Sequence, residues 1–209
     1  MRDTLSAWEE NYQTNQTPWD TGVTPPEVAA FWQSGKLAPQ GLALDLGCGT
    51  ATNVAYLAGL GLAPLGVEHA WTALQRGKER LAQREISAML VQADVTRLPF
   101  RQANARYILD IGCFHGLRDE ERRGYVRGVI ENLAVGGYYH LYAFDRVDEF
   151  RNNPERTHRG VEENEIVERF CPALTVVEIV RANPDRYPCR WYLLRRGQQD
   201  SSDSLPTSS

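Results

Sequence analysis

The sequence predicts an α/β fold in which helices flank a seven-stranded, mostly parallel sheet. Short apolar runs alternate with helical stretches along most of the 209 residues, a pattern typical of βαβ units. The last two apolar runs follow one another with only the turn signal Asn183-Pro184-Asp185 between them, so we expect an antiparallel hairpin at one end of the sheet. The expected strands span residues 42–46, 63–68, 88–92, 106–111, 136–145, 174–181 and 189–196.

Helical stretches lie between these strands and suit the right-handed crossovers that join parallel neighbours. They are expected at residues 51–59, 70–84, 119–133 and 162–170. Upstream, Trp8 and Tyr12 lie one helical turn apart within residues 3–16, which predicts an amphipathic N-terminal helix. Residues 17–26 hold a tryptophan, three prolines and a glycine, so we expect an extended loop before a helix at 27–34.

The composition is that of a single globular domain. Hydrophobic residues make up 42% and charged residues 24% of the chain, and a chain of this length can bury well over half of its unfolded surface. We expect one domain over residues 1–197, in which residues 1–36 form an N-terminal helix and lid loop. Residues 198–209 are almost entirely polar and are expected to be a disordered tail.

Charge and cysteine usage narrow the function classes. A net charge of -4 removes the electrostatic basis for binding a phosphate backbone, so nucleic acid is not an expected partner. No apolar run is long enough to cross a bilayer and no secretory signal is present, which predicts a cytoplasmic protein without a membrane partner, as a monomer or weak homodimer. The four cysteines are widely spaced, as expected of reduced thiols rather than metal ligands.

A glycine turn after the first expected strand is the main functional signal. The strand ends at Asp45-Leu46 and runs into Gly47-Cys48-Gly49, where the small residues let the backbone approach a ligand closely. Glu68 ends the next strand about twenty residues later, where open α/β folds place an acid against ribose hydroxyls. Because the carboxyl ends of neighbouring parallel strands share one crevice, the sequence predicts a nucleoside site there.

The details of the turn favour a cationic nucleoside over a dinucleotide. A dinucleotide site needs a third glycine so that pyrophosphate can sit on a helix N-terminus, and Thr52 stands at that position. An aspartate on the strand, Asp45, suits positive charge, and S-adenosylmethionine carries positive charge at sulfur and at its amino group without any phosphate. A nicotinamide-dependent oxidoreductase is the less favoured alternative. A non-catalytic module that binds S-adenosylmethionine or S-adenosylhomocysteine is another.

These motifs resemble those of class I S-adenosylmethionine-dependent methyltransferases. The string Leu44-Asp-Leu-Gly-Cys-Gly-Thr50 resembles the family's first motif, and Glu68 lies where the family has its ribose-binding acid. Further likenesses follow in the same order and spacing over roughly residues 40 to 145. They are Gln92-Ala-Asp94-Val95 at the third strand end, Tyr107-Ile-Leu-Asp110 on the fourth strand and Leu133-Ala-Val-Gly-Gly-Tyr-Tyr before the fifth.

The resemblance implies a Rossmann-like fold and a set of cofactor contacts. Asp45 would hold the methionine amino group, Glu68 with its neighbour His69 would meet the ribose, and Asp94 with Val95 would meet the adenine. Asp110 would lie beside the methionine moiety. Each acid could instead have a structural role only. Asp45 could cap the next turn, Glu68 could be a solvated strand-end residue, and Asp94 could form a turn.

Outside that core the chain resembles a narrower branch, the thiopurine S-methyltransferases and tellurite-resistance methyltransferases. The likeness rests on Trp8 to Tyr12, on Pro18-Trp-Asp-Thr-Gly22 and on Cys113-Phe-His115. It implies a small acceptor, a thiol or other soft nucleophile. One departure is Ala51, where the family has glycine, and cofactor binding is expected to tolerate it if the backbone φ there is negative.

Two residues are candidates for the acceptor side. Trp19 is either packing for the N-terminal helix or a lid over the cofactor, where a ring face would attract the sulfonium. His115 follows the fourth strand and is the candidate catalytic base, although it could equally be structural, since a thiol acceptor can arrive as thiolate. Cys113 is expected to pack, because direct transfer needs no covalent intermediate. The sequence therefore predicts methyl transfer from S-adenosylmethionine to a small molecule.

Overall fold

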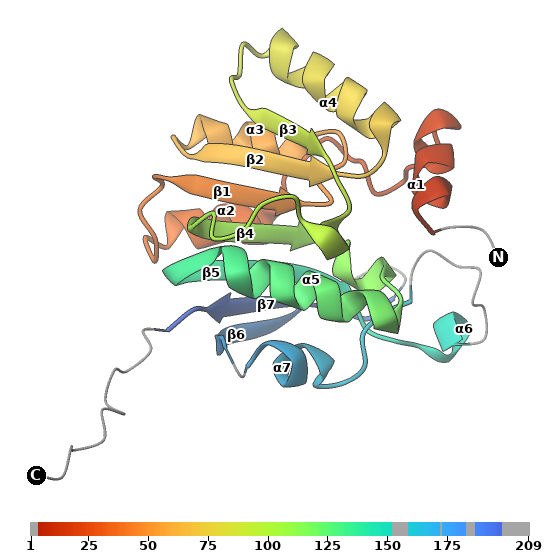
Figure 1. Cartoon of the computed structure of the whole chain (residues 1–209), viewed down its shortest axis with the longest axis vertical. Helices are drawn as coiled ribbons and strands as arrows, with labels where there is room; N and C mark the ends of the chain where they lie inside the picture. The colour runs from red at the N-terminus through yellow and green to blue at the C-terminus, as the bar shows by residue number, and fades with distance from the viewer. Residues whose placement is uncertain (1–3, 152–158, 172, 183–186, 198–209) are drawn as a thin grey trace, which may run out of the picture.

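The computed structural model describes residues 4–151, 159–171, 173–182 and 187–197. It shows one seven-stranded sheet in the order β3-β2-β1-β4-β5-β7-β6 (Figure 1). Strands β1 to β5 pair with one another in parallel, whereas β7 runs antiparallel to both β5 and β6. The expected sheet with an antiparallel pair at one end is confirmed. The strands are β1 (Leu42–Leu46), β2 (Ala63–Glu68), β3 (Met89–Gln92), β4 (Ala105–Ile111), β5 (Leu133–Phe144), β6 (Thr175–Ala182) and β7 (Cys189–Arg195).

Helices connect the strands much as expected. They are α1 (Thr4–Gln13), α2 (Pro26–Gln33), α3 (Thr52–Gly59), α4 (Trp71–Gln83), α5 (Asp119–Asn132), α6 (Asp148–Arg151) and α7 (Glu165–Phe170), with one-turn 3-10 helices η1 (Val95–Arg97) and η2 (Phe114–Gly116). The helix expected at 162–170 begins only at Glu165, because Asn164 has a φ of 65° and lies outside the helical region. The turn 183–185 and the tail 198–209 lie outside the described residues.

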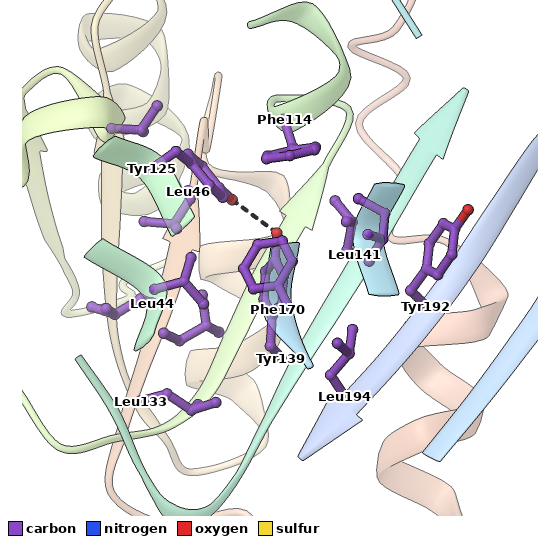
Figure 2. Close-up of a cluster of buried hydrophobic side chains, with 14 of the residues drawn as sticks. Leu44, Leu46, Phe114, Tyr125, Leu133, Tyr139, Leu141, Phe170, Tyr192 and Leu194 are labelled. Atoms are coloured by element: carbon purple, nitrogen blue, oxygen red, sulfur yellow. Dashed lines mark hydrogen bonds between the residues drawn. The ribbon is translucent and has the colours of Figure 1, made fainter. Parts of the chain in front are cut away.

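Alternation along the central strands divides the core into two layers. Leu44, Leu46 and Ile108 are buried on one face together with Tyr125 of α5 and Phe170 of α7 (Figure 2). In the same layer the hydroxyl groups of Tyr125 and Tyr139 lie 3.2 Å apart and share a hydrogen bond. The opposite face buries Ala43, Tyr107 and Leu109 against Phe31 and Trp32 of α2. Burial of one such large side chain contributes about 1.5–3 kcal/mol, so both layers fix the sheet that carries the strand ends.

Helix α1 lies beyond the carboxyl ends of β1 and β2 and is fastened to α4 (Figure 1). The first turn of α4 has Ala70 at its N-cap, which offers no side-chain acceptor. Glu9 of α1 supplies the acceptor instead, taking hydrogen bonds from Thr72 N at 3.1 Å and Thr72 Oγ1 at 2.5 Å. A carboxylate at a helix N-terminus also interacts favourably with the helix dipole. The N-terminal helix expected from the sequence is thus present, and its contacts with α4 hold it beyond the carboxyl ends of the strands.

Candidate active site

The carboxyl ends of the parallel strands open into a cavity of about 430 Å³. Its wall comes from α1 and the loop after it, from the glycine turn, from the ends of β2 and β3, and from the segments that follow β4 and end β5. The structure brings every predicted site residue except Asp110 to this wall. Those residues are Trp19, Asp45, Gly47, Cys48, Gly49, Glu68, His69, Asp94, Val95 and His115.

The glycine turn has no room for side chains at either glycine. Gly47 and Gly49 have φ values of 73° and 52°, in the left-handed region that favours glycine. A Cβ atom at Gly47 would lie 2.8 Å from the Cβ of Cys113, and one at Gly49 would lie 2.7 Å from the hydroxyl of Tyr12. Both positions therefore require glycine, and the backbone of the turn forms part of the cavity wall.

Ala51 corrects one expectation. Its φ is 62°, not negative, so the family's usual glycine is replaced here by a residue in a left-handed conformation. A Cβ in this region costs about 1–2 kcal/mol. Gly77 of α4 provides the space, since a Cβ there would lie 3.1 Å from that of Ala51. The start of α3 accordingly carries backbone strain that the sequence pattern alone did not reveal.

Glu68 ties the glycine turn to the end of β2. Its Oε2 accepts a hydrogen bond from Gly49 N at 3.0 Å, and its Oε1 accepts from the backbone N atoms of His69 and Ala70 at 2.8 Å each. Burial raises the pKa of Glu68 above its usual value, although these three bonds oppose the shift. A carboxylate offers about four acceptor positions, so a lone pair remains for a ribose hydroxyl. The residue is not merely a solvated strand end.

Asp45 is a buried carboxyl group that the surrounding protein leaves incomplete. Its side chain is 2% exposed, and its Oδ2 has no hydrogen-bond partner among the described residues. It does not cap the turn that follows, because Gly47 N and Cys48 N both donate to Val67 O. Burial, together with the nearby charges of Asp110 and Glu68, raises the pKa of Asp45 to about 8. A cation bound next to this carboxyl would favour its ionised form.

Asp94 both caps a turn and lines the cavity. Its Oδ1 accepts hydrogen bonds from Thr96 N at 2.8 Å and Thr96 Oγ1 at 2.7 Å, which starts helix η1. The same residue and Val95 belong to the cavity wall. The structural and binding interpretations of Asp94 are therefore compatible.

Asp110 does not lie on the cavity wall, so the structure does not support the direct contact with the methionine moiety that the resemblance implied. Its Oδ1 accepts from Cys113 N at 2.7 Å, and its Oδ2 accepts from Phe114 N at 2.9 Å and from the hydroxyl of Tyr125. Burial raises its pKa to about 7 although these bonds oppose the shift. Its side chain holds the turn that carries His115 through these hydrogen bonds.

An aromatic cover formed by Trp8, Tyr12 and Trp19 closes one side of the cavity. The Trp8 and Trp19 rings meet edge to face with centroids 5.2 Å apart, and Trp19 Nε1 donates to the Tyr12 hydroxyl at 3.2 Å. Asp20 fastens the cover by accepting a hydrogen bond from Thr50 Oγ1 at 2.8 Å. From the sequence, only Trp19 was assigned to the site. The spacing of Trp8 and Tyr12 directly before the Pro-Trp-Asp loop was the signal that could have found the others.

The segments that end β4 and β5 contribute a largely apolar part of the cavity wall. Ile111, Leu117 and Phe144 line it, together with Tyr142 and His115. His115 is 2% exposed, and its ring packs on that of Phe144 with centroids 4.6 Å apart. Apart from His115 none of these residues carried a sequence signal, because they are brought together only by the arrangement of β4 and β5.

Comparison with known proteins confirms the resemblance that the motifs carry. A family model described as a methyltransferase domain matches residues 43–137, which hold the glycine turn, Glu68 and Asp94. The family's cofactor is S-adenosylmethionine, and the cavity suits its positive charge. Within the described part of the chain, the cavity wall includes five carboxylate residues and no lysine or arginine. The carboxylates are Asp20, Asp45, Glu68, Asp94 and Glu121.

Two curated relatives of this chain carry informative names. It is 32% identical over 130 residues to a 2-heptyl-1-hydroxyquinolin-4(1H)-one methyltransferase of Mycobacteroides abscessus, a match that covers 62% of this chain and 56% of the relative. It is 33% identical over 75 residues to a probable thiol methyltransferase of Arabidopsis thaliana, covering 36% and 33% of the two chains. The chain thus spans little more than half the length of the first relative.

Solved structures agree with the methyltransferase fold over nearly the whole chain. A protein described in connection with conversion of a disulfide bond into a thioacetal group during echinomycin biosynthesis has a TM-score of 0.78 at 20% identity, covering 96% of this chain and 95% of that one. The Burkholderia thailandensis 1,6-didemethyltoxoflavin-N1-methyltransferase, solved with S-adenosylhomocysteine, has a TM-score of 0.74 at 19% identity, covering 92% and 87%. Separately, none of the described helices is both long and apolar enough to cross a membrane.

Proposed function

We propose that this protein transfers the methyl group of S-adenosylmethionine to a small-molecule acceptor. The observation that carries the proposal is the unpaired Oδ2 of Asp45, buried in the wall of a cavity that also contains Glu68. A cationic amino group is the ligand that such an oxygen needs, and a nucleoside with a methionine side chain brings an amino group and a ribose together. No phosphate group is required by the site.

Different residues on the cavity wall bind different parts of the cofactor in this proposal. Asp45 holds the amino group, Glu68 with His69 meets the ribose, and Asp94 with Val95 meets the adenine. The backbone of Gly47, Cys48 and Gly49 lies against the nucleoside, and Trp19 covers it. Asp110 acts through the turn that it shapes. These assignments follow the carboxyl ends of the strands from β1 to β3.

The cofactor supplies an electrophilic methyl group, and the protein supplies alignment. A nucleophile held in line with the sulfur–methyl bond can recover roughly 7–11 kcal/mol of the barrier through orientation alone. The aromatic cover of Trp8, Tyr12 and Trp19 excludes water and places ring faces near the positive charge, a contribution of about 1 kcal/mol or somewhat more. Neither effect requires a covalent intermediate on the enzyme.

The acceptor is proposed to be a small apolar molecule with a soft or weakly acidic nucleophile, such as a thiol. The wall formed by Ile111, Leu117 and Phe144 suits an apolar skeleton. The names of the hydroxyquinolinone and thiol methyltransferase relatives favour acceptors of this kind.

Calorimetry and a turnover assay test the proposal. S-adenosylmethionine and S-adenosylhomocysteine should bind, whereas NAD should not, and binding of NAD alone would reject the assignment in favour of an oxidoreductase. S-adenosylhomocysteine release is then measured with thiols, phenols, amines and metalloid oxyanions. Cofactor binding without release for any acceptor would show a non-catalytic binding module instead.

A further inference from the structure

His115 is held in one orientation by contacts on all sides. Its Nδ1 accepts a hydrogen bond from Phe144 N at 3.1 Å, and its ring packs against the ring of Phe144. Gly112 leaves room for the ring edge, since a Cβ there would lie 3.1 Å from Cε1 of His115. The carbonyl oxygen of His115 accepts from the backbone N atoms of Arg159 and Gly160 at 3.0 Å each. Side chain and backbone are therefore both fixed.

These contacts determine where the ring carries its hydrogen. A backbone N–H can only donate, so Nδ1 of His115 must keep its lone pair toward Phe144. In the neutral imidazole the single hydrogen then resides on Nε2. A second proton could enter only at Nδ1, where it would face the N–H of Phe144. The neutral ring of His115, which lines the cavity, therefore carries its hydrogen on Nε2.

Several charged groups of the described residues near His115 are engaged with other partners. On α5, Glu121 accepts from Arg118 Nη2 at 2.7 Å, and the guanidinium of Arg122, paired with Glu165, lies 3.5 Å from the His115 carbonyl oxygen. Asp110 behind the turn is bonded to Cys113 N, Phe114 N and Tyr125. Among the described residues, the packed elements also carry Cys113, Tyr142, Asp145, Arg146 and Arg159, and Asp145 is paired with Arg190. Burial raises the pKa values of Cys113 and Tyr142, so neither serves as a base near neutral pH.

We propose that His115 acts as a hydrogen-bond donor to the nucleophilic atom of the acceptor, and that acceptors are molecules whose O–H or S–H group ionises without an enzymic base. This inference rests on the proposed methyl transfer. Thiols, phenols and N-hydroxy heterocycles on apolar skeletons form the substrate class. Aliphatic alcohols lie outside this class, because their O–H group is too weakly acidic to ionise near neutral pH without a base.

Methyl transfer to such an acceptor needs no base on the protein. The acceptor loses its proton to water, and the resulting anion binds with its oxygen or sulfur against Nε2–H of His115. A lone pair of that atom forms the new bond to the methyl carbon, the carbon–sulfur bond breaks, and its electron pair stays on sulfur. The products are the methylated acceptor and the neutral thioether S-adenosylhomocysteine.

A spectroscopic titration tests the donor role without any substitution. The probe is 4-nitrophenol, whose anion absorbs visible light, bound to the protein saturated with S-adenosylhomocysteine. A donor that favours the anion should lower the pKa of the bound phenol by about one unit relative to solution. A raised pKa of the bound phenol would overturn the inference, because a proton-accepting or purely apolar environment favours the neutral phenol.

Kinetics on a series of acceptors separate donor from base. With para-substituted thiophenols and phenols at saturating S-adenosylmethionine, the inflection in the pH profile of kcat/KM should move with the acceptor's own pKa. An inflection that stays at one pH for every acceptor, and disappears in His115→Phe, would overturn the inference and identify His115 as a base. Failure of every acceptor to release S-adenosylhomocysteine despite cofactor binding would reject the proposed function itself.

Two variants at His115 provide the matched comparison. His115→Gln retains an N–H donor, whereas His115→Phe retains only the ring shape. His115→Phe should raise KM for ionised acceptors about tenfold, the effect of losing one hydrogen bond to a charged group, and shift the kcat inflection toward the acceptor's solution pKa. His115→Gln should recover most of both effects. Equal behaviour of the two variants would show that only packing matters at this position.

Discussion

The ends of β1 and β4 carry the same type of residue, but its hydrogen bonding differs between the two strands. Both strands end with a buried aspartate, Asp45 on β1 and Asp110 on β4, and the two strands are paired neighbours. Asp110 is saturated by two backbone N–H groups and a tyrosine hydroxyl, whereas Asp45 keeps an oxygen without a partner. Asp110 thus stabilises the turn after its own strand, whereas Asp45 keeps an unpaired oxygen in the cavity wall.

The difference follows from where each turn finds its hydrogen bonds. The turn after β1 uses groups of β2, since Gly47 N and Cys48 N donate to Val67 O and Gly49 N donates to Glu68. The turn after β4 instead uses the aspartate of its own strand, Asp110. Because β2 satisfies the first turn, Asp45 is released from a structural role. The comparison can be tested by removing each carboxylate separately.

Asp110→Ala should have the largest effect, and the effect should be on stability. The substitution leaves Cys113 N, Phe114 N and the Tyr125 hydroxyl buried without an acceptor. The free energy of unfolding should therefore fall by about 3–5 kcal/mol. Chemical denaturation of the ligand-free protein measures this loss. A change below about 1 kcal/mol would contradict the structural role assigned to Asp110.

Asp45→Asn should show the opposite pattern. In the proposed binding mode this change removes the charge that pairs with the cofactor's amino group, so the affinity for S-adenosylmethionine should fall about 10- to 100-fold, as for a hydrogen bond between charged groups. The ligand-free protein should be at least as stable as wild type at pH 9, because a buried unpaired carboxylate is removed. Calorimetry gives the affinity and thermal unfolding gives the stability. Weaker folding with unchanged affinity would reverse the comparison.

The pH dependence of cofactor affinity sharpens the role of Asp45. Its folded pKa is raised to about 8 in the ligand-free protein, whereas a bound cation favours the ionised form, so binding releases a proton below that pH. Affinity for S-adenosylmethionine should therefore rise as pH increases toward 8, by at most about tenfold per unit, and level off above it. Asp45→Asn should remove this part of the dependence. A titration in buffers of different ionisation enthalpy measures the proton release directly.

The stability of the ligand-free protein should change in the other direction with pH. A carboxyl whose folded pKa lies above its unfolded value binds more protons in the native state, so it lowers stability as pH rises between the two values. For Asp45 that window runs from 3.8 to about 8, and for Asp110 from 3.8 to about 7. The loss between pH 7 and 8 should shrink in Asp45→Asn, as denaturation at both pH values would show.

The sequence predicted the strand order along the chain and the residues whose roles depend on local chemistry. Gly47, Gly49 and Glu68 could be found because a glycine turn and a strand-end acid at that spacing have one common use. The distinct roles of Asp45 and Asp110 could not, because they depend on which neighbouring strand satisfies each turn. Trp8 and Tyr12 were interpreted as packing because helical spacing shows which residues share a face, but not what that face covers.

Ala51→Gly offers the smallest effect and tests how the turn after β1 is held. Ala51 has a φ of 62°, so glycine should stabilise the ligand-free protein by about 1 kcal/mol, the left-handed strain less the entropy that glycine adds to the unfolded chain. Ala55→Gly in the middle of α3 is the control and should destabilise, because glycine there relieves no strain. Destabilisation by both changes would mean that contacts of the Ala51 methyl group with α4 outweigh the strain. Stabilisation by Ala51→Gly alone would show that the groups of β2 impose the turn's conformation against the preference of its own residue.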